Sequence, residues 1–190
     1  MVLLAIDTST AVGSVALRSE SGIIGLMTVS VDLTHSEGLM PAVDDLLRRT
    51  GQTVDGISAL ACVTGPGSYT GLRVGIAAAQ GLALAKNLSC VGISSFEVLA
   101  WMLPYTRYLF CPLLSARKGW LYARLYRWME EKPQPVSDEL YIEPDELIRF
   151  IQEPTIFYGP GLASYREFLC ETLQDQFVGA PNVCNLPRAD

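Results

Sequence analysis

A glycine-rich segment running from Gly65-Pro66-Gly67-Ser68 to Gly75 joins a strand-like apolar run to a long alanine-rich run. Glycines permit a tight turn and a close backbone approach, and the exposed amides at a helix N-terminus attract anions. The segment lacks the G-x-G-x-x-G spacing of a dinucleotide-binding loop and the Lys-Ser/Thr pair of a P-loop. Two interpretations therefore stay open. Either Gly67 and Ser68 contact an anion, or Ser68 or Thr70 caps the helix while the glycines serve chain geometry.

A single histidine, His35, limits the chemistry that the chain can perform alone. It excludes, within the chain, both a Ser-His-Asp triad and a metal site built on two histidines. His35 lies in the first turn of an expected helix that Thr34 and Glu37 close as a capping box, so local hydrogen bonding is its simplest role. The five cysteines show no C-x-x-C spacing and favour free thiols in a reducing compartment.

Small residues recur every four positions after the glycine-rich segment, at Gly71, Gly75, Ala79 and Ala83. On a helix this spacing makes one smooth ridge. A glycine inside a helix costs about 1 kcal/mol relative to alanine, so the ridge favours the close approach of another backbone. That backbone belongs either to a partner protein or to the chain's own sheet, and the spacing alone does not separate the two.

Composition and charge favour a cytoplasmic protein that does not hold nucleic acid by itself. Of the 190 residues, 49% are hydrophobic; the formal net charge is −6 and the pI is near 4.8. No run approaches the roughly 18 apolar residues of a membrane span. The N-terminal run Val2–Asp7 predicts a strand rather than a signal peptide. A domain that binds nucleic acid alone usually carries a basic surface, so any nucleic acid would need a partner to hold it.

The apolar pattern predicts the same order of elements twice, as three strands, a helix, a strand and a helix. In the first half, strands are expected at residues 2–7, 14–18, 23–31, 57–63 and 89–93, with helices from residue 34 to before Gly51, at 69–86 and at 96–103. In the second half, strands are expected at 108–115, 120–128, 139–142 and 155–158, with helices after Pro144 and at 163–174. Residues 1–104 and 105–190 are therefore predicted as two domains, the second apparently shortened.

This repeated order suggests an α/β fold of the two-lobed actin-like type, a ribonuclease H-like (ASKHA) duplication in which each lobe is a mixed sheet with helices. In that superfamily, an aspartate and small hydroxyl residues after the first strand coordinate magnesium and phosphates. Asp7, Thr8, Ser9 and Thr10 occupy this place and are candidates for nucleotide contact. The alternative is a turn in which these side chains satisfy their own backbone.

Four segments together resemble the TsaB (YeaZ) family, over nearly the whole chain: Ile6–Thr10, His35–Pro41, Gly65–Gly75 and Ala116–Gly119. That family is a paralogue of TsaD, the catalytic subunit of the system that makes threonylcarbamoyladenosine in tRNA. TsaD-like proteins carry an H-x-x-x-H pair after the strand that corresponds to residues 89–93. Ser95 and Leu99 stand at those two positions here, so the resemblance implies the fold without the metal chemistry.

The resemblance implies a non-catalytic subunit that binds and activates a TsaD-like catalytic subunit during threonylcarbamoyl transfer to the adenosine beside the anticodon. It further implies a TsaE-like ATPase as partner, tRNA contact through the complex only, no membrane, and homodimers when the chain is alone. No metal or cofactor is required by this role, while ATP or ADP at a partner interface stays open. The family's partner surface is formed by the two long helices of the first lobe, which selects His35, Leu39, Val43, Gly71, Gly75 and Ala79.

Two other classes of function compete with this one. An ATPase or small-molecule kinase of the actin-like type needs acidic residues at both phosphate loops, and only Asp7 is well placed. A metallopeptidase needs a second histidine. The chain also departs from the family pattern in two ways: Ser115 stands where an aspartate often precedes Ala-Arg-Lys-Gly, and members usually continue some tens of residues past Asp190.

Overall fold

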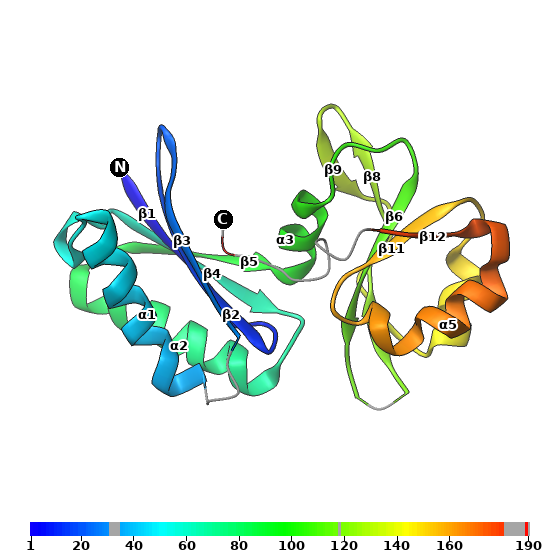
Figure 1. The fold of residues 1–190 in the computed structure, drawn as a ribbon, viewed down its shortest axis with the longest axis horizontal. Coiled ribbons are helices and arrows are strands. Elements are labelled where there is room, and N and C mark those ends of the chain that lie inside the picture. The colour runs from blue at the N-terminus through cyan, green and yellow to red at the C-terminus, as the bar shows by residue number, and fades with distance from the viewer. Residues whose placement is uncertain (31–34, 118, 181–188, 190) are drawn as a thin grey trace. The chain divides into compact units, whose positions relative to one another are not determined.

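The computed structural model describes residues 1–30, 35–117, 119–180 and 189 (Figure 1). The chain divides into two compact units, one formed mainly by Met1–Ser95 and one that begins at Phe96. Each unit has its own sheet and its own buried apolar core.

The sheet of the first unit has five strands in the order β3-β2-β1-β4-β5. Neighbours β1, β2 and β3 run antiparallel, whereas β1, β4 and β5 run parallel. Alternate side chains of β1, Leu4 and Ile6, enter the core because successive residues of a strand point to opposite faces. The strands are β1 (Val2–Asp7), β2 (Val12–Ser19), β3 (Gly22–Ser30), β4 (Ala59–Gly65) and β5 (Ser89–Ser94).

Two long helices, α1 (His35–Thr50) and α2 (Tyr69–Lys86), lie side by side against this sheet, and a short 3-10 helix, η1 (Val54–Gly56), follows α1 (Figure 1). The Ser68 hydroxyl caps α2 by accepting a hydrogen bond from Gly71 N at 3.2 Å. Asn87 ends the helix in the left-handed conformation, with φ of 52°. Thr34, half of the predicted capping box of α1, lies outside the described residues.

The second unit repeats the strand order of the first, as β10-β7-β6-β11-β12, with β8 and β9 added beside β6. Strand β6 is parallel to β11 and antiparallel to β7. The strands are β6 (Leu109–Ser115), β7 (Leu121–Ala123), β8 (Tyr126–Met129), β9 (Lys132–Pro135), β10 (Leu140–Ile142), β11 (Thr155–Tyr158) and β12 (Phe177–Gly179). The helices are α3 (Ser95–Met102), α4 (Pro144–Leu147), η2 (Ile148–Phe150), α5 (Leu162–Leu173) and η3 (Gln174–Gln176).

Three details of the second unit differ from the sequence-based expectation. The single strand expected at residues 120–128 is two strands, because β7 pairs with the end of β6 whereas β8 pairs with Phe110 near its start. Strand β8 turns back into β9 through Glu130 and Glu131, which both have positive φ. Strand β12, which comes after α5, has only three residues. Its apolar run is too short for the sequence pattern to predict a strand.

Helix α3 packs within the second unit. Phe96, Leu99, Ala100 and Leu103 are buried in one cluster with Phe110 of β6. The compact unit that contains them therefore begins before the domain boundary that the sequence predicts between residues 104 and 105.

Candidate functional site

The two polar segments singled out in the sequence meet in the first unit, where the end of β1 contacts the start of α2. Ser68 N donates to the Ser9 carbonyl oxygen at 2.7 Å, and the Thr8 hydroxyl donates to the Gly71 carbonyl oxygen at 2.7 Å. Ser9 N donates to an Asp7 carboxylate oxygen at 2.8 Å. The chain thus joins two loops that are about sixty residues apart in sequence by direct hydrogen bonds.

Two glycines make this close contact sterically allowed. A Cβ atom on Gly67 would collide with the carbonyl oxygen of Ser9, and a Cβ atom on Gly75 would collide with the hydroxyl of Thr8. Real Cβ atoms do not approach other heavy atoms so closely, so any larger residue would push the loop away from the helix.

Part of the local interpretation of both segments is present in the structure. Ser68 caps α2, and the Thr10 hydroxyl both donates to the carbonyl oxygen of Val12, at 3.0 Å, and accepts from its amide, at 3.2 Å. Asp7, Thr8 and Ser9 are buried, and the Ser9 hydroxyl has no hydrogen-bond partner among the described residues. Contact of Asp7, Thr8, Ser9, Thr10, Gly67 and Ser68 with a nucleotide or anion stays a prediction.

The ridge of small residues on α2 faces the sheet of its own unit. Gly71 and Gly75 are buried, and Ala79 is fully buried in the core. Of the two interpretations that the spacing left open, the structure has the ridge packed inside its own unit, where Gly75 faces the side chain of Thr8. The reason is the helical phase, because Val74, Ala78 and Leu82 also pack on this core and fix the inward face.

The residues selected on α1 have a similar place. Leu39 and Val43 are 6% and 2% exposed and belong to the same core, so neither presents a side chain to a partner. The side chain of His35 lies outside what the structure describes. As a correction, Leu39, Val43, Gly71, Gly75 and Ala79 are core residues of the first unit rather than surface residues.

The outward face of α2 carries a second small ridge, which the sequence reasoning missed. Ala77, Gly81 and Ala85 are exposed and recur every four residues. A Cβ atom on Gly81 would meet no heavy atom within 4 Å, so packing inside the chain does not explain this glycine. Leu84 beside it is 87% exposed.

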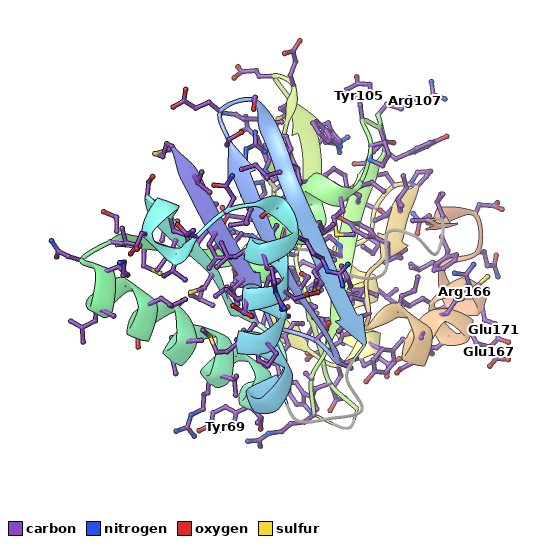
Figure 2. All side chains as sticks on the ribbon, turned by 60° about the vertical axis from the view of Figure 1, so that its left-hand side comes forward. Tyr69, Tyr105, Arg107, Arg166, Glu167 and Glu171 are labelled. Carbon is purple, nitrogen blue, oxygen red and sulfur yellow. The ribbon has the colours of Figure 1, made fainter. Side chains whose placement is uncertain are left out.

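The charged groups at the two ends of α2 are exposed. Tyr69 projects from the start of the helix, and the Arg73 guanidinium lies 5.3 Å from the centre of its ring (Figure 2). At the other end, Lys86 donates to Asp55 of η1, and this hydrogen bond and the ammonium charge lower the pKa of Asp55. The outward face of α2 is therefore mostly small or apolar and bounded by basic side chains.

The positions that correspond to the paired histidines of TsaD-like proteins hold residues without metal-binding capacity. Leu99 is fully buried among apolar side chains, and its carbonyl oxygen accepts a hydrogen bond of 2.9 Å from the Tyr158 hydroxyl. Ser95 is also fully buried. Within the described ranges, no three His, Cys, Asp or Glu side chains are grouped to bind a metal ion. None of the helices in the part of the chain that is described is long and apolar enough to cross a membrane.

Comparison with known proteins identifies relatives that match most of the chain. A family model described as TsaD, tRNA N6-adenosine threonylcarbamoyltransferase, matches residues 20–186. The tRNA threonylcarbamoyladenosine biosynthesis protein TsaB of Bacillus subtilis is 30% identical over 94% of this chain and 80% of the relative. The solved structure of YeaZ from Pseudomonas aeruginosa superposes with a TM-score of 0.79 at 25% identity, covering 100% of this chain and 88% of that one.

A more distant structure shows the fold alone. Ethanolamine utilization protein EutJ of Carboxydothermus hydrogenoformans gives a TM-score of 0.55 at 12% identity, over 97% of this chain and 87% of that one. Together with the repeated strand order, these structures confirm the predicted two-lobed actin-like fold. The resemblance to TsaB (YeaZ) is confirmed as well. This chain belongs to the TsaB family, within the wider family that the TsaD model describes.

Proposed function

We propose that this chain is a non-catalytic subunit required for threonylcarbamoyladenosine synthesis in tRNA, and that it acts by binding and activating a TsaD-like catalytic subunit. The observation that carries the proposal is its 30% identity with a protein named for this biosynthesis, over 94% of the chain. The match of residues 20–186 to the TsaD family model supports the partnership, because related folds can pair through equivalent elements.

The non-catalytic part of the proposal is supported by the side chains on α3. A buried leucine cannot ligate a metal ion, and a lone serine is a poor ligand, so Ser95 and Leu99 cannot replace a pair of histidines. We expect metal analysis of the purified protein to find no stoichiometric zinc or iron. We also expect the isolated chain to hydrolyse neither ATP nor peptides at a useful rate, and measured turnover of either would contradict the proposal.

The proposed partner surface is the outward face of α1 and α2. On α2 it comprises Ala77, Gly81 and Ala85, with Leu84 beside them. On α1 the exposed apolar side chain is Met40, which is 44% exposed. Glycine in a helix is unfavourable by about 1 kcal/mol, and nothing inside the chain requires it at position 81. A partner helix that packs close to Gly81 would explain why this position is a glycine.

The experiment compares Gly81→Leu with wild type in a titration against the TsaD-like protein of the same organism. Leucine should insert at the point of closest approach and weaken binding roughly five- to hundredfold, as overpacking by about 1–3 kcal/mol predicts. Circular dichroism should show a folded protein, since leucine is the better helix former and its Cβ has open space. Gly81→Ala is the matched control and should bind with little change. Unchanged affinity of a folded Gly81→Leu protein would refute this surface.

The remaining partners follow from the same role and form part of the proposal. The chain is cytoplasmic, a TsaE-like ATPase joins the complex, ATP or ADP binds at a partner interface if at all, and the chain forms homodimers when alone.

With a net charge of −6, the isolated chain should bind tRNA weakly because it releases few counterions from the phosphates. Tight, salt-sensitive binding of tRNA in a filter assay without any partner would contradict this expectation.

A further inference from the structure

Strand β3 stands at one edge of the first sheet, and among the described residues no other strand pairs with its outer side. Its nine residues, Gly22–Ser30, contain neither a charged residue nor a proline, the residues that normally keep an exposed edge from pairing with another chain. The edge strands of the second unit are shorter: β9 has four residues, and β10 and β12 have three each. Strand β9 also carries Lys132, Pro133 and Pro135. The outer side of β3 is therefore a long edge that is open to a further strand.

The backbone of β3 has the geometry that a further antiparallel strand needs. Strands β2 and β3 pair antiparallel, and the irregularity of their register lies at Leu17 and Arg18, near the hairpin turn. From Gly25 to Ser30 the register is continuous. Because a bulge twists an edge away from a partner, its place near the turn leaves the rest of β3 suited to pairing.

Helix α1 packs directly on β3. A Cβ atom on Gly25 would come within 2.8 Å of the Thr50 methyl carbon and 2.9 Å of a Leu46 methyl carbon, so this flank of α1 is the one nearest the sheet edge. Arg49 lies one helical turn after Leu46, and Asp45 lies one turn before Arg49, so both extend from the same flank. Arg49 Nε donates to an Asp45 carboxylate oxygen at 2.6 Å. The flank of α1 beside the edge thus carries one acid and one base along the helix axis.

This edge is complementary to itself. Two β3 strands related by a two-fold axis run antiparallel, and because the strand is uncharged no like charges meet between them. The same axis makes the two α1 helices antiparallel to each other. Because Gly25, near the middle of β3, lies under Leu46 and Thr50, the axis passes close to this part of α1. An antiparallel pair of helices then brings Asp45 of each copy toward Arg49 of the other. Charge complementarity therefore favours a second copy of this chain as the partner strand.

The other described charges around the edge are balanced. Arg18 and Glu20 lie at the β2–β3 turn and have opposite signs. On the side of α1 that faces away from Leu46, Arg48 pairs with Asp44 at 3.3 Å, and it also reaches Asp45 at 3.3 Å. Two further acids, Asp32 and Glu37, have side chains outside the described residues. The described side chains thus give no excess of one sign that would repel an identical surface.

We propose that two copies of this chain associate through the outer edge of β3, with the two α1 helices side by side over the joined strands. The proposal rests on the homodimer that forms part of the function proposed above, and it assigns a surface to that dimer. This surface is separate from the ridge of α2 that contains Gly81, so self-association and binding of a TsaD-like partner can be tested independently.

Sedimentation velocity of the full chain measures the dimer, and exchange of the two charges identifies its surface. Asp45→Arg sets bases against bases across the axis, and Arg49→Asp sets acids against acids. Each variant alone should self-associate about two- to thirtyfold more weakly than wild type, because the lost attraction acts at two symmetry-related contacts. An equal mixture of the two variants should form a heterodimer at least as tight as the wild-type dimer, which a merely destabilised protein would not do. Asp44→Arg, on the other side of α1, is the matched control and should change self-association little.

Hydrogen exchange then tests the pairing of the strands. The amides of β3 should exchange more slowly at high than at low protein concentration, whereas those of β5, at the opposite edge of the sheet, should not change. Thr28→Lys places a charge at an exposed position of β3 and should weaken the dimer about two- to thirtyfold, and Thr28→Ser should not. A TsaD-like partner should bind Thr28→Lys as it binds wild type, while Gly81→Leu should still form the dimer. The two proposals therefore fail separately.

Four results would overturn the proposal. They are a chain that stays monomeric up to about 1 mM, a mixture of the Asp45→Arg and Arg49→Asp proteins that does not associate, a dimer that leaves exchange of the β3 amides unchanged, and a dimer that Gly81→Leu abolishes. The last result would assign self-association to the outward face of α2 instead of the edge of β3.

Discussion

The two units have the same strand order and the same Gly-Pro-Gly tripeptide. They differ in the segments and helices that surround the sheet and the tripeptide. Gly65-Pro66-Gly67 begins at the last residue of β4 in the first unit, and Gly159-Pro160-Gly161 follows β11, the strand at the same place in the second. Each tripeptide leads into the helix that packs next to the central strand. Because the second copy is not followed by the hydroxyl-rich pattern of the first, the shared glycines serve the turn itself and not one particular chemistry.

The contacts of the glycines agree with this interpretation. Gly67 faces the carbonyl oxygen of Ser9, just after β1, and a Cβ on Gly161 would lie 2.7 Å from the carbonyl carbon of Leu114 in β6. In both units the helix begins where the first strand of the sheet leaves no room for a side chain. The motif that looked most like a ligand site in the sequence is thus first of all a requirement of the fold.

The helices, unlike the glycine turns, differ between the two units. Helices α1 and α2 have 16 and 18 residues, whereas α4 and α5 have 4 and 12. The first unit therefore presents two long outward faces, while the second presents the β8–β9 hairpin and the ring contacts of Trp128 with Trp101 and Tyr105. We infer that the duplicated sheet is the common scaffold and that the elements around it differ between the two units.

The largest expected effect is that of an alanine in either glycine turn. Gly67→Ala and Gly161→Ala should each lower the free energy of unfolding by about 3 kcal/mol, because the new Cβ meets backbone atoms that cannot rotate away. Urea denaturation measures the loss. Gly56→Ala is a suitable control, since its Cβ would have ordinary contacts at 3.7 Å, and it should change stability little. Tolerance of alanine at 161 but not at 67 would show that the two turns are not equivalent.

A smaller effect is expected where the obstacle is a side chain. Gly75→Ala should cost about 2 kcal/mol in unfolding free energy, because the Cβ would collide with the Thr8 hydroxyl. Thr8→Ala removes that hydroxyl and its hydrogen bond to Gly71. The double mutant should therefore recover part of the loss, and a double-mutant cycle measures the coupling. Additive losses would mean that Thr8 is not the obstacle.

Sequence reasoning found the order of elements because apolar periodicity is local, and it found both loops of the β1–α2 contact. It failed on the face of α2 because two small ridges, at Gly71/Gly75/Ala79 and at Ala77/Gly81/Ala85, have the same spacing, and only packing on the sheet separates them. It missed the split of residues 120–128 because the break depends on pairing with β6 rather than on local composition. The ring contact between Trp101 of α3 and Trp128 of β8 depends on the fold, because no sequence spacing brings these two residues together.

The cysteines of the two units can be compared in the same way. Among the residues that the structure describes, each unit has one buried cysteine on a core strand and one exposed cysteine: Cys62 and Cys90 in the first, Cys111 and Cys170 in the second. Burial, together with the neighbouring Cys90 thiol, raises the pKa of Cys62 to about 11, and burial raises that of Cys111 to about 12, both above the usual value near 8.5. A maleimide at pH 8 should therefore label Cys90 and Cys170 quickly and the buried pair slowly.

These raised pKa values also make alkaline stability depend on the buried thiols. The unfolded chain loses each thiol proton near pH 8.5 whereas the folded chain keeps it, so this contribution is complete below pH 8.5 and is lost as pH rises toward 11 to 12. The Cys111 thiol should cost about 1.4 kcal/mol of unfolding free energy per pH unit in that window, and the Cys62 thiol should cost less because solvent screens it and Cys90 causes part of its shift. Urea denaturation of Cys62→Ala and Cys111→Ala at pH 8 and pH 10 should show a shallower pH dependence for each. An unchanged slope for both would contradict burial as its cause.

The smallest effect concerns the exposed ion pair between Asp55 of η1 and Lys86 at the end of α2. The hydrogen bond and charge of Lys86 lower the pKa of Asp55, so any stabilisation is present above the ordinary aspartate pKa near 3.9 and is lost as pH falls through the folded value. Because Asp55 is exposed, solvent and salt screen the pair and little stability should depend on it. Lys86→Met should return the pKa of Asp55 to its ordinary value, measured by NMR titration of the carboxyl carbon. Arg127→Met, which breaks the exposed pair with Glu153 in the second unit, should leave Asp55 unchanged. A pKa of Asp55 that stays low without Lys86 would contradict Lys86 as its cause. It would mean that other charges of the first unit, rather than this one ion pair, lower the pKa of Asp55.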